Sequence, residues 1–435
     1  MSALYVTLLF YIPLTLIYLL LISGKRDRAF LLLVVMLAWL MLGSITAFMN
    51  TWMPFSGGGD DWGYYVDANT PIESFADLFD IRKYADQYAQ PGYAWFLSLI
   101  NALTGQDLLA YKLSNLAFLI ILSLTWYRIG CLLEGPMLGR AVMVGVILLT
   151  PLWYYVFFLL KDMLITLLQS IFIMALVHEW RASRLQFWLL AGAVTFATLP
   201  FRSAILIQNS LIAFGSLVVQ MSQNKNKIRL SIKISLAIIL FYGLLNFGSD
   251  YSRMASLGIV SESHVIGSDL MKQRFEMGDS DGQTNRYLFP FIYILTEVSG
   301  INLMTWDLYD STWLRGILAL PWIFLLVPLI LLGFRWLLLC PTPGFSHRGI
   351  LNRLRFSRAA TTPWFIIIIF VIGSFFVSLV TGDTTRWRIP DMPALLTLGV
   401  AGWVFTERHL NIRAIVLWLS GFGSIILMYY FLKMI

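Results

Sequence analysis

Residues 3–50 decide the fold, and they read ALYVTLLFYIPLTLIYLLLIS at 3–23, GKRDRA at 24–29 and FLLLVVMLAWLMLGSITAFMN at 30–50. Each apolar run reaches the roughly 20 residues that a helix needs to cross about 30 Å of hydrocarbon. Both runs are continuous rather than alternating in polarity, and unpaired backbone groups are costly in lipid. We therefore predict two membrane helices joined by a charged turn.

The composition of the whole chain agrees with these two runs. The chain is 58% hydrophobic and 13% charged, with a mean hydropathy of +0.75, whereas soluble domains carry about 25% charged residues. The first run has no basic region before it and no A-x-A-like cleavage site after it, so we expect a retained helix. The net charge of +7 is scattered over short loops, which favours membrane orientation over nucleic-acid binding.

Further apolar runs extend this pattern over the chain, so we predict an all-α, polytopic transmembrane bundle that forms a single domain over 1–435. About twelve spans are expected, with uncertain boundaries. They lie near residues 3–23, 30–50, 108–134, 139–157, 163–180, 186–200, 204–221, 230–247, 314–338, 361–380, 390–407 and 414–432.

The basic residues of short loops set the orientation, because such loops stay on the cytoplasmic side. With the turn at 24–28 placed there, both chain ends and most acidic residues face outward. We therefore expect the chemistry at the extracytoplasmic face of a bacterial inner (plasma) membrane. The other loop cations on the cytoplasmic side are Arg140, Arg181, Arg184, Lys225, Lys227, Arg229, Arg348, Arg353, Arg355, Arg358 and Arg408.

Two long outer loops, 51–107 and 248–313, interrupt the series of spans. Each contains an apolar stretch, at 91–103 and 287–302, that is too short to span, so we expect interfacial or re-entrant helices there. In the first loop, the residues from Pro71 onward have the pattern of an amphipathic helix start.

The first loop also holds the strongest catalytic candidates, Asp60 and Asp61, directly after three glycines at 57–59. Glycines allow a sharp turn, and adjacent carboxylates repel, which raises the pKa of one of them toward the range of a general base. The same pair could hold a divalent metal ion. The alternative is a solvated acidic turn.

Three further groups of charges lie at predicted outer helix ends. Lys161 and Asp162 stand between two apolar runs, where ionisable residues are usually functional or paired; the alternative is a tight outer hairpin. Arg202, Arg386 and Arg388 lie on the side where cations are not expected. A guanidinium suits a lipid phosphate because it bonds two oxygens at once, although an arginine also snorkels to ordinary headgroups.

Several other chemistries find no support in the sequence. The four histidines form no cluster at metal-ligand spacing, and the two cysteines, Cys131 and Cys340, offer no disulfide framework. Motifs for nucleotide binding, zinc proteases and serine hydrolases are missing from the sequence. Nucleotide hydrolysis and zinc chemistry are therefore not expected.

The order of these motifs resembles the GT-C superfamily of polytopic glycosyltransferases, in particular bacterial relatives of the protein O-mannosyltransferases and the lipid A aminoarabinose transferases. In that family an acidic motif follows the first span, whereas here it follows the second, and the usual second glutamate is an aspartate. The motifs that carry the resemblance are DDWGYYVDA at 60–68, PGYAWFL at 91–97, KD at 161–162, LPFRS at 199–203 and RWRIPDMP at 386–393.

The resemblance implies transfer of a sugar, with inversion, from a polyprenyl-phosphate donor to a glycolipid, polysaccharide or protein acceptor. Asp60 or Asp61 would then be the general base, and Asp162 would orient an arginine, contact the sugar or assist the base. The resemblance also implies that the donor phosphate meets cations and that aromatic residues position the substrate. These are Lys161, Arg202, Arg386 and Arg388 for the phosphate, and Tyr64, Tyr65 and Tyr93 for the substrate.

Two other functions remain open at this point. A polymerase of lipid-linked polysaccharide repeats has a similar helix count and outward arginines. A transporter of small molecules or lipid-linked oligosaccharides also has about twelve helices, but transporters keep ionisable groups at mid-span. The predicted position of nearly all charges at helix ends favours the transferase.

Overall fold

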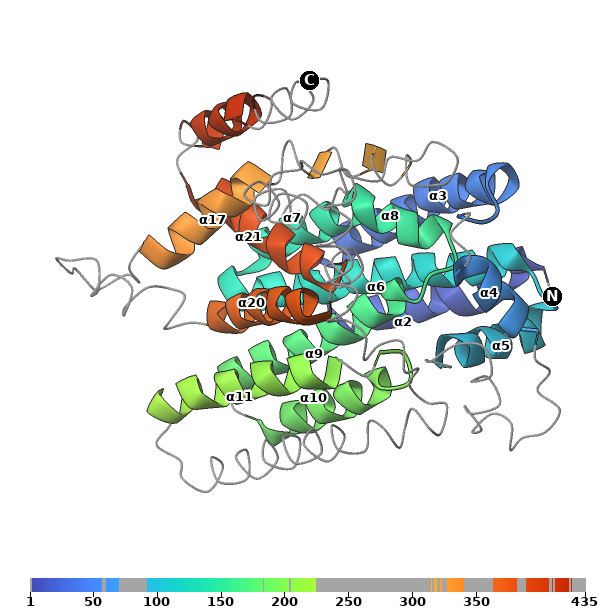
Figure 1. The fold of residues 1–435 in the computed structure, drawn as a ribbon, viewed down its shortest axis with the longest axis horizontal. Coiled ribbons are helices and arrows are strands. Elements are labelled where there is room, and N and C mark those ends of the chain that lie inside the picture. The colour runs from blue at the N-terminus through green and yellow to red at the C-terminus, as the bar shows by residue number, and fades with distance from the viewer. Residues whose placement is uncertain are drawn as a thin grey trace, which may run out of the picture.

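All regular elements in the described part of the chain are helices, which confirms the all-α class (Figure 1). Apart from single positions, the computed structural model describes residues 2–56, 60–69, 92–182, 184–202, 205–223, 327–339, 363–381, 389–406 and 411–421.

The first span is one continuous helical rod, Ala3–Ile22, made of α1 (Ala3–Val6), a π-helical turn η1 (Thr7–Tyr11) and α2 (Ile12–Ile22). The π-turn directly precedes Pro13, whose nitrogen carries no hydrogen to donate to the preceding turn. A wider turn accommodates the proline without breaking the rod. The helix α3 (Arg28–Trp52) follows and is, like the rod, long and apolar enough to cross a membrane.

The helix α6 (Leu108–Glu134) forms the centre of the bundle. Almost every residue between Ala110 and Gly130 is buried, and α2, α3, α7, α8 and α9 all pack on it (Figure 1). Asp107 caps its start, because its carboxylate accepts from the N–H groups of Leu109 at 3.0 Å and Ala110 at 3.4 Å. At about 1.5 Å per residue this helix is about 40 Å long, enough to cross a bilayer.

The predicted span 139–157 is two helices rather than one. The helix α7 (Pro136–Ile147) and the helix α8 (Thr150–Phe157) meet at a bend of 49°. Pro151, in the first turn of α8, cannot donate to the last turn of α7, which explains the break. The backbone near this bend must therefore find hydrogen-bond partners inside the protein.

The remaining described helices surround this core. These helices are α9 (Asp162–Ala182), α10 (Leu185–Thr198), α11 (Ile205–Gln223), α17 (Val327–Leu339), α20 (Trp364–Thr381), the 3-10 turn η6 (Ile389–Asp391) and α21 (Met392–Phe405). Small residues allow two of them, α17 and α21, to pack closely, since a Cβ added at Gly402 of α21 would lie 2.5 Å from the backbone nitrogen of Gly333 in α17.

Among the described residues, four helices are long and apolar enough to cross a membrane, or five if the bent pair is one span. These helices support the assignment of the chain as a membrane protein. The larger number of about twelve stays a prediction, because the expected span 230–247, part of 314–338 and about half of 414–432 lie outside the described residues.

The described part of the loop 51–107 contains two short helices, α4 (Asp60–Asp67) and α5 (Gly92–Thr104). The expectation of a helix too short to span at 91–103 is confirmed by α5. The predicted amphipathic helix start at Pro71 and the whole loop 248–313, with its stretch 287–302, lie outside the described residues.

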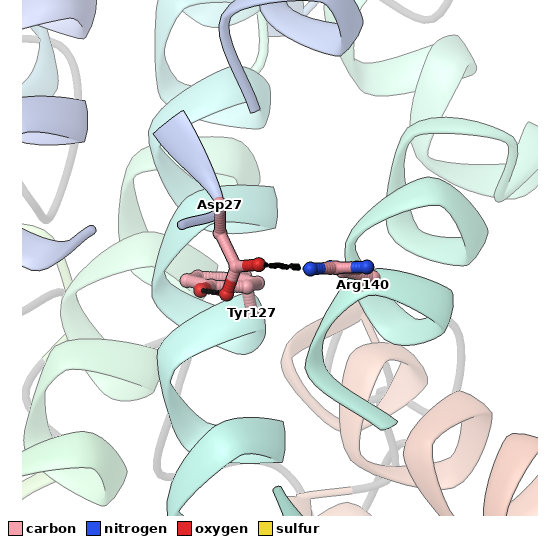
Figure 2. A network of polar contacts seen from close by, with 3 residues as sticks. All are labelled: Asp27, Tyr127 and Arg140. Atoms are coloured by element: carbon pink, nitrogen blue, oxygen red, sulfur yellow. Dashed lines mark hydrogen bonds and ion pairs between the residues drawn. The ribbon is translucent and has the colours of Figure 1, made fainter. Parts of the chain in front are cut away.

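One end of the bundle joins residues that the charge pattern assigns to the cytoplasm. Arg140 of α7 binds Asp27 of the turn before α3 through its Nε at 3.0 Å, and Tyr127 of α6 donates to the same carboxylate (Figure 2). At this end, Arg181 of α9 donates to the carbonyl oxygen of Leu132 at 2.9 Å. The Tyr127 hydroxyl and the Arg140 guanidinium hold the pKa of Asp27 below its usual value.

Candidate functional site

Asp61 fixes the start of α4. Its carboxylate is fully buried and accepts from the backbone N–H of Ser56 and, at 3.0 Å, from that of Trp62. Lys112 of α6 is the buried cation that interacts with Asp61, and its Nζ donates to the Pro54 carbonyl oxygen at 2.7 Å. Asp61 therefore ties Ser56 to the start of α4, and sequence reasoning missed Lys112 as its counterion.

The two tyrosines of the acidic motif point in different directions. The buried Tyr64 ring lies edge-on to the Tyr93 ring at 5.0 Å between centroids, and the Lys161 Nζ lies 5.9 Å from the Tyr64 centroid. Tyr65, one position later, instead packs against Phe55 at 5.5 Å and Tyr111 at 6.3 Å. Tyr64 thus connects α4 with the other candidate residues, whereas Tyr65 lies on the opposite packing surface.

The buried Asn115 of α6 supports the Lys161-Asp162 corner from behind. It accepts from the Tyr93 hydroxyl at 3.2 Å, and its Nδ2 lies within 3.3 Å of the carbonyl oxygens of Tyr155, Phe158 and Leu160. These carbonyls lie at the end of α8 and in the short non-helical segment that leads into α9. One buried amide therefore satisfies backbone groups that the helices leave open. A polar residue in an apolar helix was the only sequence signal for it.

The predicted pairing of Asp162 with an arginine involves Arg202. Arg202 Nη2 lies 3.1 Å from Asp162 Oδ1, and both side chains are buried, with 6% and 1% of their surfaces exposed. The Oδ2 atom of Asp162 has no hydrogen-bond partner among the described residues. Asp162 also lies in the first turn of α9, where the helix dipole favours its negative charge. The two sequence motifs, 40 positions apart, therefore form one buried ion pair.

The Pro-Gly-Tyr motif docks directly beside this pair. Gly92 donates its N–H to the Pro200 carbonyl oxygen at 3.0 Å, and a Cβ added at Gly92 would lie 2.7 Å from Pro200. Only glycine allows this approach of two backbones. The close contact brings Tyr93 to the segment that carries Arg202, two residues after Pro200.

The motif RWRIPDMP at 386–393 also reaches α9, because η6 (Ile389–Asp391), which lies within that motif, packs against this helix. Arg386 and Arg388 lie outside the described residues, and for Asp60 the structure describes the backbone as the first residue of α4. Lys161 is buried, with 9% of its surface exposed. Tyr64, Tyr93, Lys161, Asp162 and Arg202 are thus linked by contacts to one another or to neighbouring residues. Figure 1 shows α4 and α5, which carry the two tyrosines, at one end of the bundle.

Asp67 at the end of α4 is a titratable group that sequence reasoning did not select. Burial raises the pKa of its carboxyl to about 6, and its Oδ2 has no hydrogen-bond partner in the part of the chain that is described. A carboxyl with this pKa changes charge just below neutral pH.

The side chains that commonly bind metal ions form no cluster in the described part of the chain. No group of three or more His, Cys, Asp or Glu side chains within the described ranges has the geometry to hold a metal ion. A divalent ion at Asp60 and Asp61 stays a prediction.

Comparisons with known proteins leave the family open. The chain matches no protein-family model, and no curated protein matches it. The resemblance to the GT-C superfamily therefore rests on its short motifs alone and stays a prediction.

Proposed function

We propose that the protein is a membrane glycosyltransferase that moves a sugar from a polyprenyl-phosphate donor to an acceptor hydroxyl at the extracytoplasmic face of the plasma membrane. One observation carries the proposal. Four of the motifs that resemble the GT-C superfamily, far apart in the sequence, meet through the Tyr64–Lys161 contact, the Asp162–Arg202 ion pair and the Gly92–Pro200 hydrogen bond.

Lys161 and Arg202 are the cations that we assign to the donor phosphate. As the bond between the anomeric carbon and the phosphate oxygen breaks, the leaving phosphate gains negative charge. Fixed cations in a site of low dielectric constant stabilise that charge more in the transition state than in the ground state. Asp162 would hold the Arg202 guanidinium in orientation through Oδ1, and its second oxygen is available for a sugar hydroxyl.

Asp60 is the better general base of the two adjacent acids. The Asp61 carboxylate is occupied by the backbone N–H groups of Ser56 and Trp62. Position 60 precedes Tyr64 by four residues and therefore shares its face of α4, which is the face toward Lys161. The carboxylate of Asp60 would take the acceptor proton while the acceptor oxygen attacks the anomeric carbon, which gives inversion.

Exchange of each acid for its amide tests this assignment. We expect Asp60→Asn to lower sugar transfer by about 10²- to 10⁴-fold, the usual contribution of a general base, without lowering thermal stability. Asp61→Asn should instead destabilise the fold by about 1 kcal/mol, because it weakens the bonds to Ser56 and Trp62. Transfer is measured in membranes with a polyprenyl-phosphate sugar, and unfolding in detergent.

A matched control lies at the other end of the bundle. Glu134 accepts from the Trp364 indole at 3.1 Å, and the amide oxygen of Glu134→Gln retains that bond, so this variant should keep full transfer activity. Full activity of both Asp60→Asn and Asp61→Asn would remove the base assignment. Extraction of membrane glycolipids from a deletion strain would then identify the donor, because the carrier-linked sugar should accumulate.

One observation favours a transporter as the second candidate function. Three buried polar side chains are joined by hydrogen bonds deeper in the bundle. Gln169 of α9 donates to Gln208 of α11 at 2.7 Å, and Gln208 donates to Ser374 of α20. Polar groups inside a membrane are expensive and mark pathways in many transporters. Uptake of labelled lipid-linked sugar by vesicles that contain the protein, without transfer to an acceptor, would support this function over the transferase.

A further inference from the structure

A groove runs along the outside of the bundle between α3 and α7, at the end away from α4 and α5. Its two parts have volumes of about 670 Å³ and 350 Å³ and adjoin at Val144, which lines both. The first part contains Arg140, and the second is lined by apolar side chains only. We call the whole feature the α3–α7 groove, with Phe30, Met137, Arg140 and Val144 in its first part, and Val34, Leu37, Met41, Val144, Ile147 and Leu148 in its second part.

The apolar part of the groove opens on the surface that would face lipid. Leu37 and Leu148 each expose 54% of their surfaces; Leu37 belongs to the candidate span α3, and Leu148 lies at the bend between α7 and α8. The helices α3 and α7 both pack on α6 and touch each other little, which leaves the groove between them. From Arg140 to Ile147 the groove follows seven residues of helix, about 10 Å at 1.5 Å per residue, which is most of the depth of one leaflet.

Positive charge gathers at and beside the first part of the groove, at the level where headgroups would lie. Arg140 lines the groove with a side chain that is 45% exposed and binds Asp27, whose neighbours Lys25 and Arg26 in the turn and Arg28 at the start of α3 are exposed. With Asp27, these five residues carry a net charge of 4 − 1 = +3. A neutral lipid gains nothing from this charge, whereas an anionic headgroup does.

The guanidinium of Arg140 is held in place for a second partner. Its Nε and Nη2 bind one oxygen of Asp27, and its plane lies 5.7 Å from the Phe30 ring centroid. Figure 2 shows the other end of the guanidinium turned away from Asp27. A guanidinium has five N–H donors, so the two bonds to Asp27 leave three, and no other hydrogen bond of Arg140 involves a described residue. A rigid arginine of this kind suits a phosphate oxygen.

We propose that the α3–α7 groove binds an anionic glycerophospholipid of the surrounding bilayer, with its phosphate at Arg140 and the turn 25–28 and one acyl chain along the apolar part. The lipid would fill the gap between two helices that scarcely touch each other and bridge the turn to α7. This site lies at the opposite end of the bundle from the candidate site and does not depend on the glycosyltransferase proposal.

Native mass spectrometry of the purified protein with added phosphatidylglycerol or phosphatidylcholine tests the proposal. We expect one phosphatidylglycerol to bind more tightly than phosphatidylcholine. The double variant Lys25→Gln/Arg28→Gln leaves the Asp27–Arg140 pair intact and should lose roughly 30-fold in phosphatidylglycerol affinity, about fivefold per charge. Val144→Trp should fill the groove where its two parts meet and lower the affinity for both lipids.

Two controls separate this site from general charge and bulk effects. Arg184→Gln removes an exposed charge, and Leu189→Trp adds bulk to an exposed surface of α10; both should leave binding unchanged. Equal binding of the two lipids by the unmodified protein, or unchanged binding by Lys25→Gln/Arg28→Gln, would overturn the proposal. Competition by water-soluble glycerol phosphate would also overturn it, because it would reveal an anion site that needs no acyl chain.

Discussion

At the scale of single residues, the buried pair of Asp162 and Arg202 can serve either the stability of the fold or the function of the site. Two charges taken out of water cost several kcal/mol each, and their attraction roughly offsets that cost. Such a pair contributes little net stability compared with apolar residues of the same size. Its presence is therefore better explained by the chemistry that an arginine and a carboxylate perform than by folding.

A double substitution separates these two roles. Asp162→Leu alone leaves the Arg202 guanidinium buried without its carboxylate partner, so we expect a loss of about 3–5 kcal/mol in the free energy of unfolding. Asp162→Leu/Arg202→Met replaces the pair by apolar side chains and should recover most of that stability without any sugar transfer. Thermal unfolding and transfer are measured on the same detergent preparations. Sugar transfer by the double variant would reduce the pair to a structural role.

Asp67 gives a pH dependence that can be assigned to one carboxyl. Its folded-state pKa of about 6 lies above the value of about 4 in an unfolded chain. Its contribution to stability is therefore fully present below pH 4 and is lost as the pH rises through 6. Asp67→Asn should flatten the melting temperature between pH 4.5 and 7.5 and stabilise the protein by about 1 kcal/mol at pH 7.5. An unchanged pH profile would show that another group titrates there.

At the scale of elements, the site depends on how α5 meets the end of α10. Gly92→Ala would place a Cβ 2.7 Å from Pro200, so α5 must shift, at a cost of about 1–3 kcal/mol. We expect transfer to fall more than stability, because Arg202 follows Pro200 by two residues. Gly192→Ala in α10 is the matched control, since its Cβ meets nothing within 4 Å and should change stability by less than about 1 kcal/mol. Equal activity of the two variants would contradict this coupling.

At the scale of the whole molecule, the sequence predicted much of the bundle because lipid imposes a simple rule on chain segments. The predicted span at 108–134 coincides with α6, and the runs at 3–23 and 30–50 match the first rod and α3 within two residues. The bend between α7 and α8 was missed. Hydropathy measures only the apolar character of a window, and a proline one turn into a helix leaves that character unchanged.

The candidate site was predictable only as separate pieces. The charges of Lys161, Asp162 and Arg202 are conspicuous because ionisable groups near hydrocarbon are rare. Their pairing and the contact between Tyr64 and Lys161 depend on which helices are neighbours, which hydropathy does not contain. Lys112 and Asn115 were missed for the same reason: each lies in an apolar run and acquires its role from a partner more than 35 positions away.

The orientation of the bundle can be tested directly. In a background with Cys131→Ser and Cys340→Ser, single cysteines are placed at two exposed positions by Arg26→Cys and Gln106→Cys. We expect a membrane-impermeant maleimide to label Gln106→Cys on intact cells and to label Arg26→Cys only after the membrane is opened, because short basic loops stay inside. Labelling in the reverse order would place the candidate site on the cytoplasmic side.

The amide of Asn115 sets the length of the chain between α8 and α9. It lies within hydrogen-bond distance of three carbonyl oxygens, at Tyr155, Phe158 and Leu160. An inserted residue in that connection would carry at least one of these carbonyls out of reach and leave it unsatisfied at membrane depth. Surface loops usually tolerate insertions, but this corner behaves as a connector of fixed length, so the position of Lys161 along the chain is as constrained as its chemistry.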